Sequence, residues 1–185
     1  MIGVDIMDRL KNSKVYSMAL IALFAALTAV FSQIIIPIGP VPINLALLSV
    51  FICGGVLGWK KASLSMVIYI LLGIAGVPVF SGFQGGLAKI AGPTGGYIVG
   101  YLIAAFVIGI ITDKFGRKIL PLICSMVLGL ILCYAFGTIW FVLLMNQGIV
   151  ASLMTCVIPF LPGDAVKIAV AVIVVKALSK TKLVP

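Results

Sequence analysis

The chain has 185 residues, of which 63% are hydrophobic and only 9% are charged. A water-soluble domain carries about 25% charged residues, so this composition excludes a soluble protein and indicates one embedded in a lipid bilayer. The net charge of +9 does not indicate a nucleic-acid partner, because the basic residues lie in short clusters between apolar runs and not in one patch with interleaved aromatic residues.

Six apolar runs reach or approach the roughly 20 residues that a helix needs to cross a bilayer. We therefore expect an all-α integral membrane protein with a single membrane domain, residues 1–185. The six predicted transmembrane helices cover about residues 15–36, 43–59, 62–78, 96–112, 119–144 and 163–178. Prolines and glycine at 37–42 end the first run, Lys60 and Lys61 separate the second from the third, and residues 113–118 divide the fourth from the fifth.

Two connections between these helices are apolar although they contain helix-breaking residues. Residues 79–95 are rich in glycine, and residues 145–162 end in the sequence PFLPG. Such segments fit loops that fold back over a cavity, so we expect the extracellular loop 79–95 to cover a pocket. A seventh span over 148–161 is the alternative for the second connection, although its prolines and shortness disfavour it.

The basic residues orient the helices. With both chain ends in the cytoplasm, eleven of the thirteen lie at cytoplasmic helix ends, as the positive-inside rule requires. These eleven are Arg9, Lys11, Lys14, Lys60, Lys61, Lys114, Arg117, Lys118, Lys176, Lys180 and Lys182. The acids Asp5, Asp8 and Asp113 fall on the same side. Three charges remain toward the outer half, namely Lys89, Asp164 and Lys167.

Asp164 and Lys167 are three residues apart at the outer start of the last helix, so their side chains share a face. Charges in a transmembrane segment cost about 2.5–3.5 kcal/mol each at mid-bilayer and usually mark a substrate site. We expect them to bind a polar or anionic ligand, together with backbone N–H groups near Gly163. The alternative is an ion pair that only anchors the helix end. Lys89 either lines the same site or is solvated at its rim.

The sequence GPTGGY (92–97) leads into the fourth helix. Gly96 would let backbone approach a ligand, Thr94 could cap the helix, and Tyr97 offers an aromatic ring with a hydroxyl. Gln84 and Gly86 lie in the same loop and are further ligand-binding candidates. Glycine-rich membrane loops can also serve as tight turns alone.

A stripe of small residues on the first helix comprises Ala22, Ala25, Ala26 and Ala29. Such stripes allow close helix–helix contacts in lipid. The stripe therefore predicts either an interface with a partner subunit or an ordinary contact within the chain.

Several kinds of site are absent from the sequence. There is no histidine and no CxxC pair among the four cysteines, so no metal site is expected. There is no GxxxxGK[ST] nucleotide-binding loop, no HExxH and no GxSxG motif. We expect neither an enzyme nor a bound cofactor.

Four segments carry a resemblance that covers about residues 15–178. They are GPVPINL (39–45), GVPVFSGFQGG (76–86), GPTGGY (92–97) and IPFLPGDAVK (158–167). In this order they resemble BioY, the biotin-binding S component of energy-coupling factor (ECF) transporters. The resemblance departs at Ala46, where the family often has a glutamine.

The resemblance implies a multi-pass protein of a prokaryotic plasma membrane that captures biotin in an outward-facing pocket. Partners would be a coupling membrane subunit, with the alanine stripe at its interface, and two cytoplasmic ATPases that supply the energy. Asp164 and Lys167 match the family motif, with expected roles in contacting the ureido ring and compensating the carboxylate of biotin. Which residue takes which end stays open, although a lysine–carboxylate pair is the natural role for Lys167. Asn44 would lie at the pocket.

Two other hypotheses fit the same residues. The chain could be a stand-alone proton-coupled vitamin carrier in which Asp164 is the proton site, although no convincing inverted repeat is visible. It could also be a membrane scaffold in which Asp164 and Lys167 form a purely structural pair.

Overall fold

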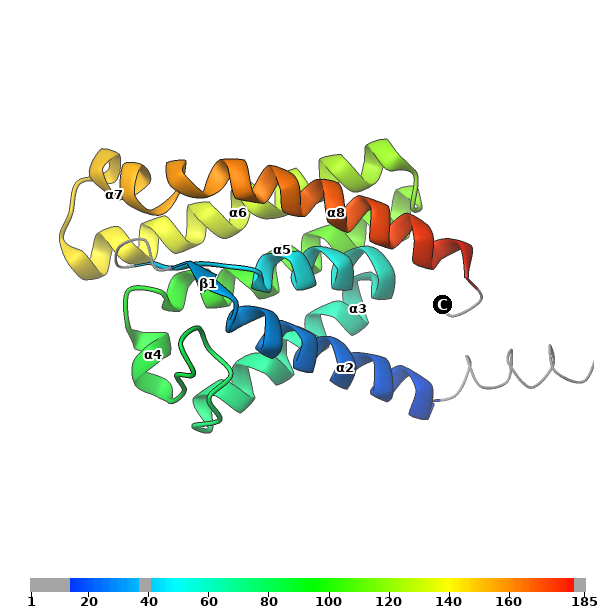
Figure 1. Ribbon diagram of the computed structural model, residues 1–185, viewed down its shortest axis with the longest axis horizontal. Helices are drawn as coiled ribbons and strands as arrows, with labels where there is room; N and C mark the ends of the chain where they lie inside the picture. The colour runs from blue at the N-terminus through cyan, green and yellow to red at the C-terminus, as the bar shows by residue number, and fades with distance from the viewer. Residues whose placement is uncertain (1–13, 37–40, 182–185) are drawn as a thin grey trace, which may run out of the picture.

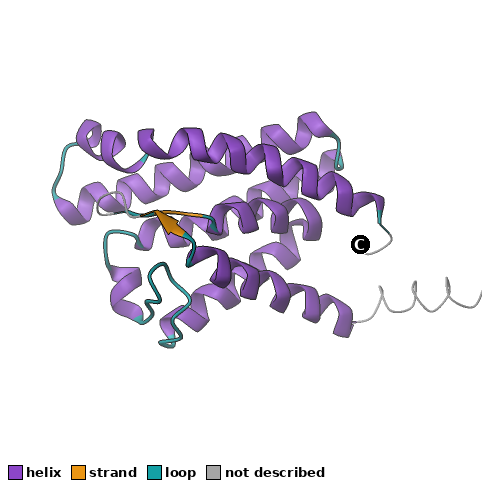
Figure 2. Cartoon of the chain, in the orientation of Figure 1, coloured by secondary structure: helices purple, strands orange, loops and turns teal. Residues whose placement is uncertain are grey.

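The computed structural model describes residues 14–36 and 41–181, which are almost entirely helical (Figure 2). The elements in chain order are α2 (Lys14–Ser32), β1 (Ile35–Ile36), β2 (Ile43–Asn44), α3 (Ala46–Ile74), α4 (Leu87–Ala91), α5 (Gly95–Phe115), α6 (Ile119–Met145), α7 (Ile149–Cys156), the 3-10 helix η1 (Ile158–Phe160) and α8 (Leu161–Lys180). The two short strands form an antiparallel pair in which Ile35 lies opposite Asn44.

Five apolar segments of the described chain are long enough to cross a membrane: α2, α3, α5, α6 and the continuous stretch 149–180. The predicted second and third helices together correspond to α3, which is interrupted at Gly58. Figure 1 shows the chain turning back within α3, so its two halves correspond to two of the six predicted helices. The break falls at Gly58 and not at Lys60–Lys61, because the backbone there adopts φ 72° and ψ 174°, a conformation that favours glycine.

Two side chains stabilise this break: Asp113, in the last turn of α5, and Arg117, in the connection between α5 and α6. The backbone N–H of Trp59, which begins the second half of α3, donates to Asp113 Oδ2 at 3.1 Å. Arg117 donates from Nε to the carbonyl of Gly55 at 3.0 Å and from Nη2 to that of Val56 at 2.8 Å. An acid thus meets the N–H groups of one helix and a base meets the carbonyls of the other, as the helix dipoles favour.

Replacing Asp113 by alanine is expected to lower the melting temperature of the purified protein by about 2–4 °C, because losing a helix cap costs about 1 kcal/mol. Asp113→Asn keeps a side-chain oxygen that can accept the bond from Trp59 and serves as the matched control. A scanning-fluorescence melt in one detergent compares them. Equal melting temperatures for the alanine variant and the parent would contradict a capping role.

The interface between α5 and α6 depends on glycine. A Cβ added at Gly100 would lie 2.8 Å from the sulfur of Cys133, and one at Gly137 would lie 2.3 Å from the ring of Tyr97. Both positions therefore allow the two helices to approach closely, which is how membrane helices gain packing energy in lipid. This approach brings Tyr97 of α5 beside α6.

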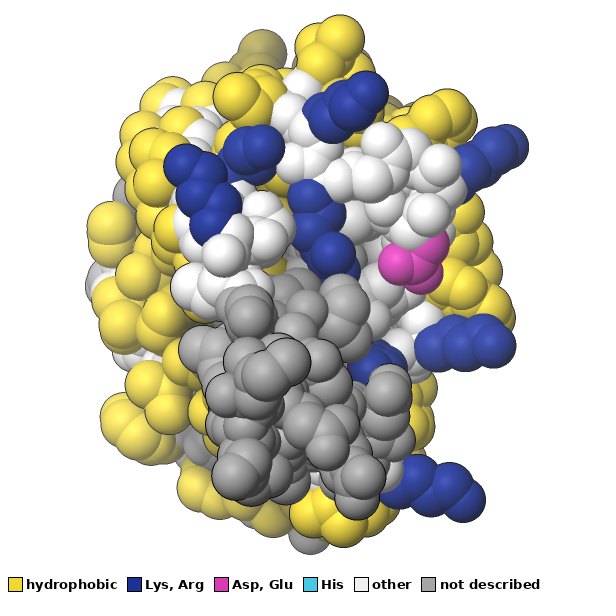
Figure 3. All heavy atoms as spheres, turned by 90° about the vertical axis from the view of Figure 1, so that its right-hand side faces the viewer, with side chains coloured by type: hydrophobic (Ala, Val, Ile, Leu, Met, Phe, Trp, Pro, Cys, Tyr) yellow, Lys and Arg dark blue, Asp and Glu magenta, His cyan; other side chains and the backbone are white. Residues whose placement is uncertain are grey.

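The charges of the described residues divide the molecule into two ends. Lys14 begins α2 and Lys180 ends α8 on the same side of the bundle, at the right of Figure 1. Figure 3 views that end and shows Lys and Arg side chains gathered around it. The basic end agrees with the predicted cytoplasmic side. Arg9, Lys11, Lys182, Asp5 and Asp8, which also entered that prediction, lie outside the described residues.

The opposite end carries the two apolar connections. The loop 79–95 contains the short helix α4 and a bridge between Phe80 and Gln84. The second connection forms α7 and η1, which leads directly into α8. With only eight residues, α7 is too short to be a seventh span.

Candidate ligand-binding pocket

A pocket lies at the end of the bundle that is opposite the basic face, where the β1–β2 pair, α4 and the start of α8 are found (Figure 1). Its wall is mostly apolar and aromatic, with Val41, Pro42, Ile43, Leu47, Ile98 and Phe160 among the lining residues. Four tyrosines also line it, contributed by α3, α5 and α6. An apolar wall with few polar groups is typical of small-molecule sites.

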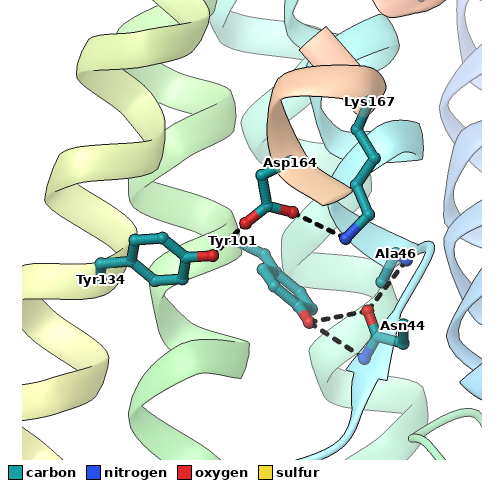
Figure 4. A network of polar contacts seen from close by, with 6 residues as sticks. All are labelled: Asn44, Ala46, Tyr101, Tyr134, Asp164 and Lys167. Atoms are coloured by element: carbon teal, nitrogen blue, oxygen red, sulfur yellow. Dashed lines mark hydrogen bonds and ion pairs between the residues drawn. The ribbon is translucent and has the colours of Figure 1, made fainter. Parts of the chain in front are cut away.

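The predicted pair at the start of α8 lines this pocket. Lys167 Nζ donates to Asp164 Oδ1 at 2.7 Å, and the Tyr134 hydroxyl from α6 donates to Asp164 Oδ2. Figure 4 shows the three side chains converging. Asp164 is 1% exposed and Lys167 is 6% exposed, so water screens this pair little.

Lys167 is therefore not a free cation at the pocket, because Asp164 neutralises it. Because residues three apart on a helix face each other, the same spacing that places both side chains on one face also lets them neutralise each other. The cluster as a whole is uncharged but still polar. Each carboxylate oxygen has accepting capacity left, and the ammonium has three N–H groups of which Asp164 takes one. Gly163, whose backbone was expected to contribute, lies in the first turn of α8 and is exposed.

Asn44, in β2, links the start of α3 to the loop that follows α3. Its Oδ1 accepts at 3.0 Å from the backbone N–H of Ala46, the first residue of α3. Its Nδ2 donates to the hydroxyl of Ser81 at 2.8 Å, and the Tyr101 hydroxyl lies 3.4 Å from both amide atoms. Figure 4 shows Asn44 with Tyr101 and Ala46. Ala46 thus contributes to this arrangement through its backbone N–H, which does not depend on its side chain. Residues 39 and 40 of the motif GPVPINL lie outside the described residues.

Gln33, which directly follows α2, holds the loop that follows α3. Its Oε1 accepts from the backbone N–H of Phe83 at 2.8 Å, and its Nε2 donates to the carbonyl of Phe80 at 3.1 Å. Because this loop supplies Ser81 to the pocket, Gln33 fixes part of the wall without lining it. No sequence pattern indicates this role, since Gln33 is a single polar residue at the end of an apolar run.

Two predictions for GPTGGY concern residues that line the pocket. The expected capping by the Thr94 side chain is wrong: Thr94 has φ −91° and ψ −7°, and its side chain makes no capping bond. A capping residue usually has an extended backbone, whereas here a helical turn already precedes α5. Its hydroxyl is buried and has no hydrogen-bond partner among the described residues. Tyr97 lines the pocket, and its hydroxyl lies 3.1 Å from that of Thr138.

Three predicted site residues lie away from the pocket wall. A Cβ at Gly96 would meet Trp140 of α6 at 2.3 Å, so this glycine serves helix packing and not a ligand. Gln84 is exposed and pairs with Phe80 through its backbone. Gly86 has φ 90°, and its N–H donates to the carbonyl of Gly73 at 2.6 Å. The last two shape the loop.

Lys89 lines the pocket from α4 and is partly buried. Its removal from water lowers the pKa of the ammonium below its usual range. Across residues 14–36 and 41–181, no ion pair or hydrogen bond of this ammonium is found.

Sequence reasoning missed Tyr101, Tyr134 and Ser81 of the pocket. Tyr101 could have been found, because it lies one helical turn after Tyr97 and so on the same face. Tyr134 is a hydroxyl-bearing aromatic residue within an otherwise apolar run, which is a weaker signal.

The alanine stripe on α2 does not form one exposed face. Ala22 and Ala26 are exposed and Ala29 is partly buried, whereas Ala25 is 3% exposed and belongs to the core. Ala25 therefore makes the ordinary contact within the chain, and only Ala22, Ala26 and Ala29 are accessible to a partner.

Comparisons with known proteins agree on one family. A family model described as the BioY family matches residues 7–183. The "Probable biotin transporter BioY" of Pyrococcus horikoshii is 43% identical over 165 residues, covering 89% of this chain and 97% of that protein. The "Biotin transporter BioY" of Thermotoga maritima is 38% identical and covers 87% of this chain and 94% of its own. A crystal structure of "the S-component for biotin from an ECF-type ABC transporter" matches with a TM-score of 0.86 and 31% identity, covering 92% of this chain and 94% of that one.

Proposed function

The chain belongs to the BioY family, and from this premise we propose that it is the S component of an ECF importer that binds biotin from the extracellular side. It is a multi-pass protein of a prokaryotic cell membrane and not an enzyme. A coupling subunit and two cytoplasmic ATPases would complete the importer. The sequence contains no Walker-type nucleotide loop of its own, so the partners would supply ATP hydrolysis.

The single observation that carries this proposal is the neutral polar cluster in an apolar pocket. Biotin has an apolar body and a ureido ring with two N–H donors and one carbonyl acceptor. Asp164 can accept from an N–H of the ring, and Lys167 can donate to its carbonyl, while their mutual bond of 2.7 Å is kept. Tyr97 and Tyr101 provide aromatic surface for the apolar body.

The first test is ligand binding by the purified chain without nucleotide or ion gradient. Biotin is expected to raise the melting temperature, because a ligand at 100 times its Kd stabilises the folded state by about 2.7 kcal/mol. Riboflavin, thiamine and folate at the same concentration serve as controls. Absence of a shift with biotin, or a larger shift with another vitamin, would contradict the proposal.

Reconstitution separates an S component from a stand-alone carrier. Proteoliposomes that contain this chain alone are expected not to accumulate biotin under a proton gradient, since Asp164 is held by Lys167 and Tyr134. Gradient-driven accumulation by the chain alone would support the carrier and overturn the S-component assignment.

A further inference from the structure

The pocket contains two lysines in different electrostatic situations. Lys167 comes from α8 and is neutralised by Asp164 at 2.7 Å. Lys89 comes from α4, and its ammonium has neither an ion pair nor a hydrogen bond among the residues that the structure describes. Asp113, the other acid of the described chain, lies at the opposite end, where it contacts Trp59. One unpaired cation therefore remains in the wall.

A carboxylate that approached Lys167 would meet the carboxylate of Asp164, which shares the same ammonium. Like charges at such short range repel, and displacing Asp164 would leave it buried without its cation, which is strongly destabilising. The cluster on α8 is therefore suited to a neutral polar group. It is a poor site for an anion.

A carboxylate that approached Lys89 would meet the opposite situation. Partial burial has already removed water from this ammonium and disfavours its charged form. A ligand carboxylate would compensate for the lost hydration of the ammonium with a charge-assisted hydrogen bond, which is stronger than a neutral one. The hydroxyl of Thr94 lies five residues later at the start of α5, also lines the pocket and is without a described partner. It can act as a second donor.

We propose that Lys89 binds the carboxylate of the ligand, with Thr94 as a second donor, while Asp164 and Lys167 bind the neutral ureido ring at the other end. This inference rests on the proposed binding of biotin and assigns its orientation. It replaces the expectation that Lys167 compensates the carboxylate. The preference of the pocket for a charged over an uncharged ligand would then come from Lys89 of α4.

The test compares biotin with biotinamide, which keeps the ring and chain but has no charge. The wild-type protein is expected to prefer biotin about 10-fold to 100-fold, the range of a hydrogen bond to a charged group. Lys89→Met is expected to lose this preference and to bind biotin and biotinamide with equal affinity. Lys89→Arg keeps the cation and should keep the preference. Lys180→Met, on the exposed end of α8, is the matched control.

Each outcome of this comparison is decisive. A Lys89→Met variant that still prefers biotin overturns the assignment. If Lys167→Met loses the preference and Lys89→Met keeps it, Lys167 on α8 binds the carboxylate instead. If the wild-type protein binds neither ligand, the proposed function itself fails. A melting temperature of Lys89→Met equal to that of the parent shows that the variant is folded, independently of either ligand.

Discussion

Replacing Lys167 by alanine is expected to weaken biotin binding about 100-fold or more, or about 2.8 kcal/mol. The substitution removes the proposed donors to the ureido carbonyl. It also leaves Asp164, which is 1% exposed, without its cation and with Tyr134 as its remaining described partner. Breaking a buried ion pair from one side costs about 3–5 kcal/mol in measured cases. Titration calorimetry of purified variants gives the affinities.

The matched control for this prediction is Lys180→Ala, because Lys180 lies on the same helix and is exposed at its far end. Its affinity should stay within about twofold of the parent. A second variant, Asp164→Asn combined with Lys167→Met, removes both charges. Its melting temperature should be higher than that of Lys167→Ala, because no unpaired buried charge remains, but it should still not bind biotin. If Lys167→Ala and Lys180→Ala bind biotin equally well, the pair on α8 has only the structural role of the scaffold hypothesis.

Replacing Ala22 or Ala26 by tryptophan is expected to block biotin uptake by the complete importer while leaving biotin binding intact. Both residues are exposed on α2, and neither lines the pocket. If this face contacts the coupling subunit, a tryptophan would separate two helices that must approach closely. Uptake of labelled biotin by cells that express all subunits measures transport, and thermal shift of the purified chain measures binding.

Two further alanines provide controls for this interface. Ala135→Trp, on an exposed position of α6, adds the same bulk to another lipid-facing helix and should not change uptake. Ala25→Trp should instead destabilise the chain itself, because Ala25 is buried in the core. Normal uptake by the Ala22 and Ala26 variants would place the docking face elsewhere.

The bilayer environment and the path of the chain follow from local properties of the sequence. An apolar run of about 20 residues can satisfy its backbone in lipid only as a helix, so 96–112 and 119–144 become α5 (Gly95–Phe115) and α6 (Ile119–Met145) within a few residues. The placement of Lys and Arg orients those helices. The motif GDAVK similarly predicts two charges on one helix face, because three residues make almost one turn.

Only the tertiary structure decides what each face contacts, since the rotation of a helix about its axis is set by packing against its neighbours. Gly96 therefore meets Trp140 and not a ligand, and Ala25 turns into the core while Ala22 stays outside. The tertiary structure likewise decides whether a charged side chain of the pocket is paired with an opposite charge. Lys167 is neutral in effect because Asp164 reaches it and Tyr134 supports Asp164 from another helix, whereas Lys89 is brought to the same pocket with no described acid beside it.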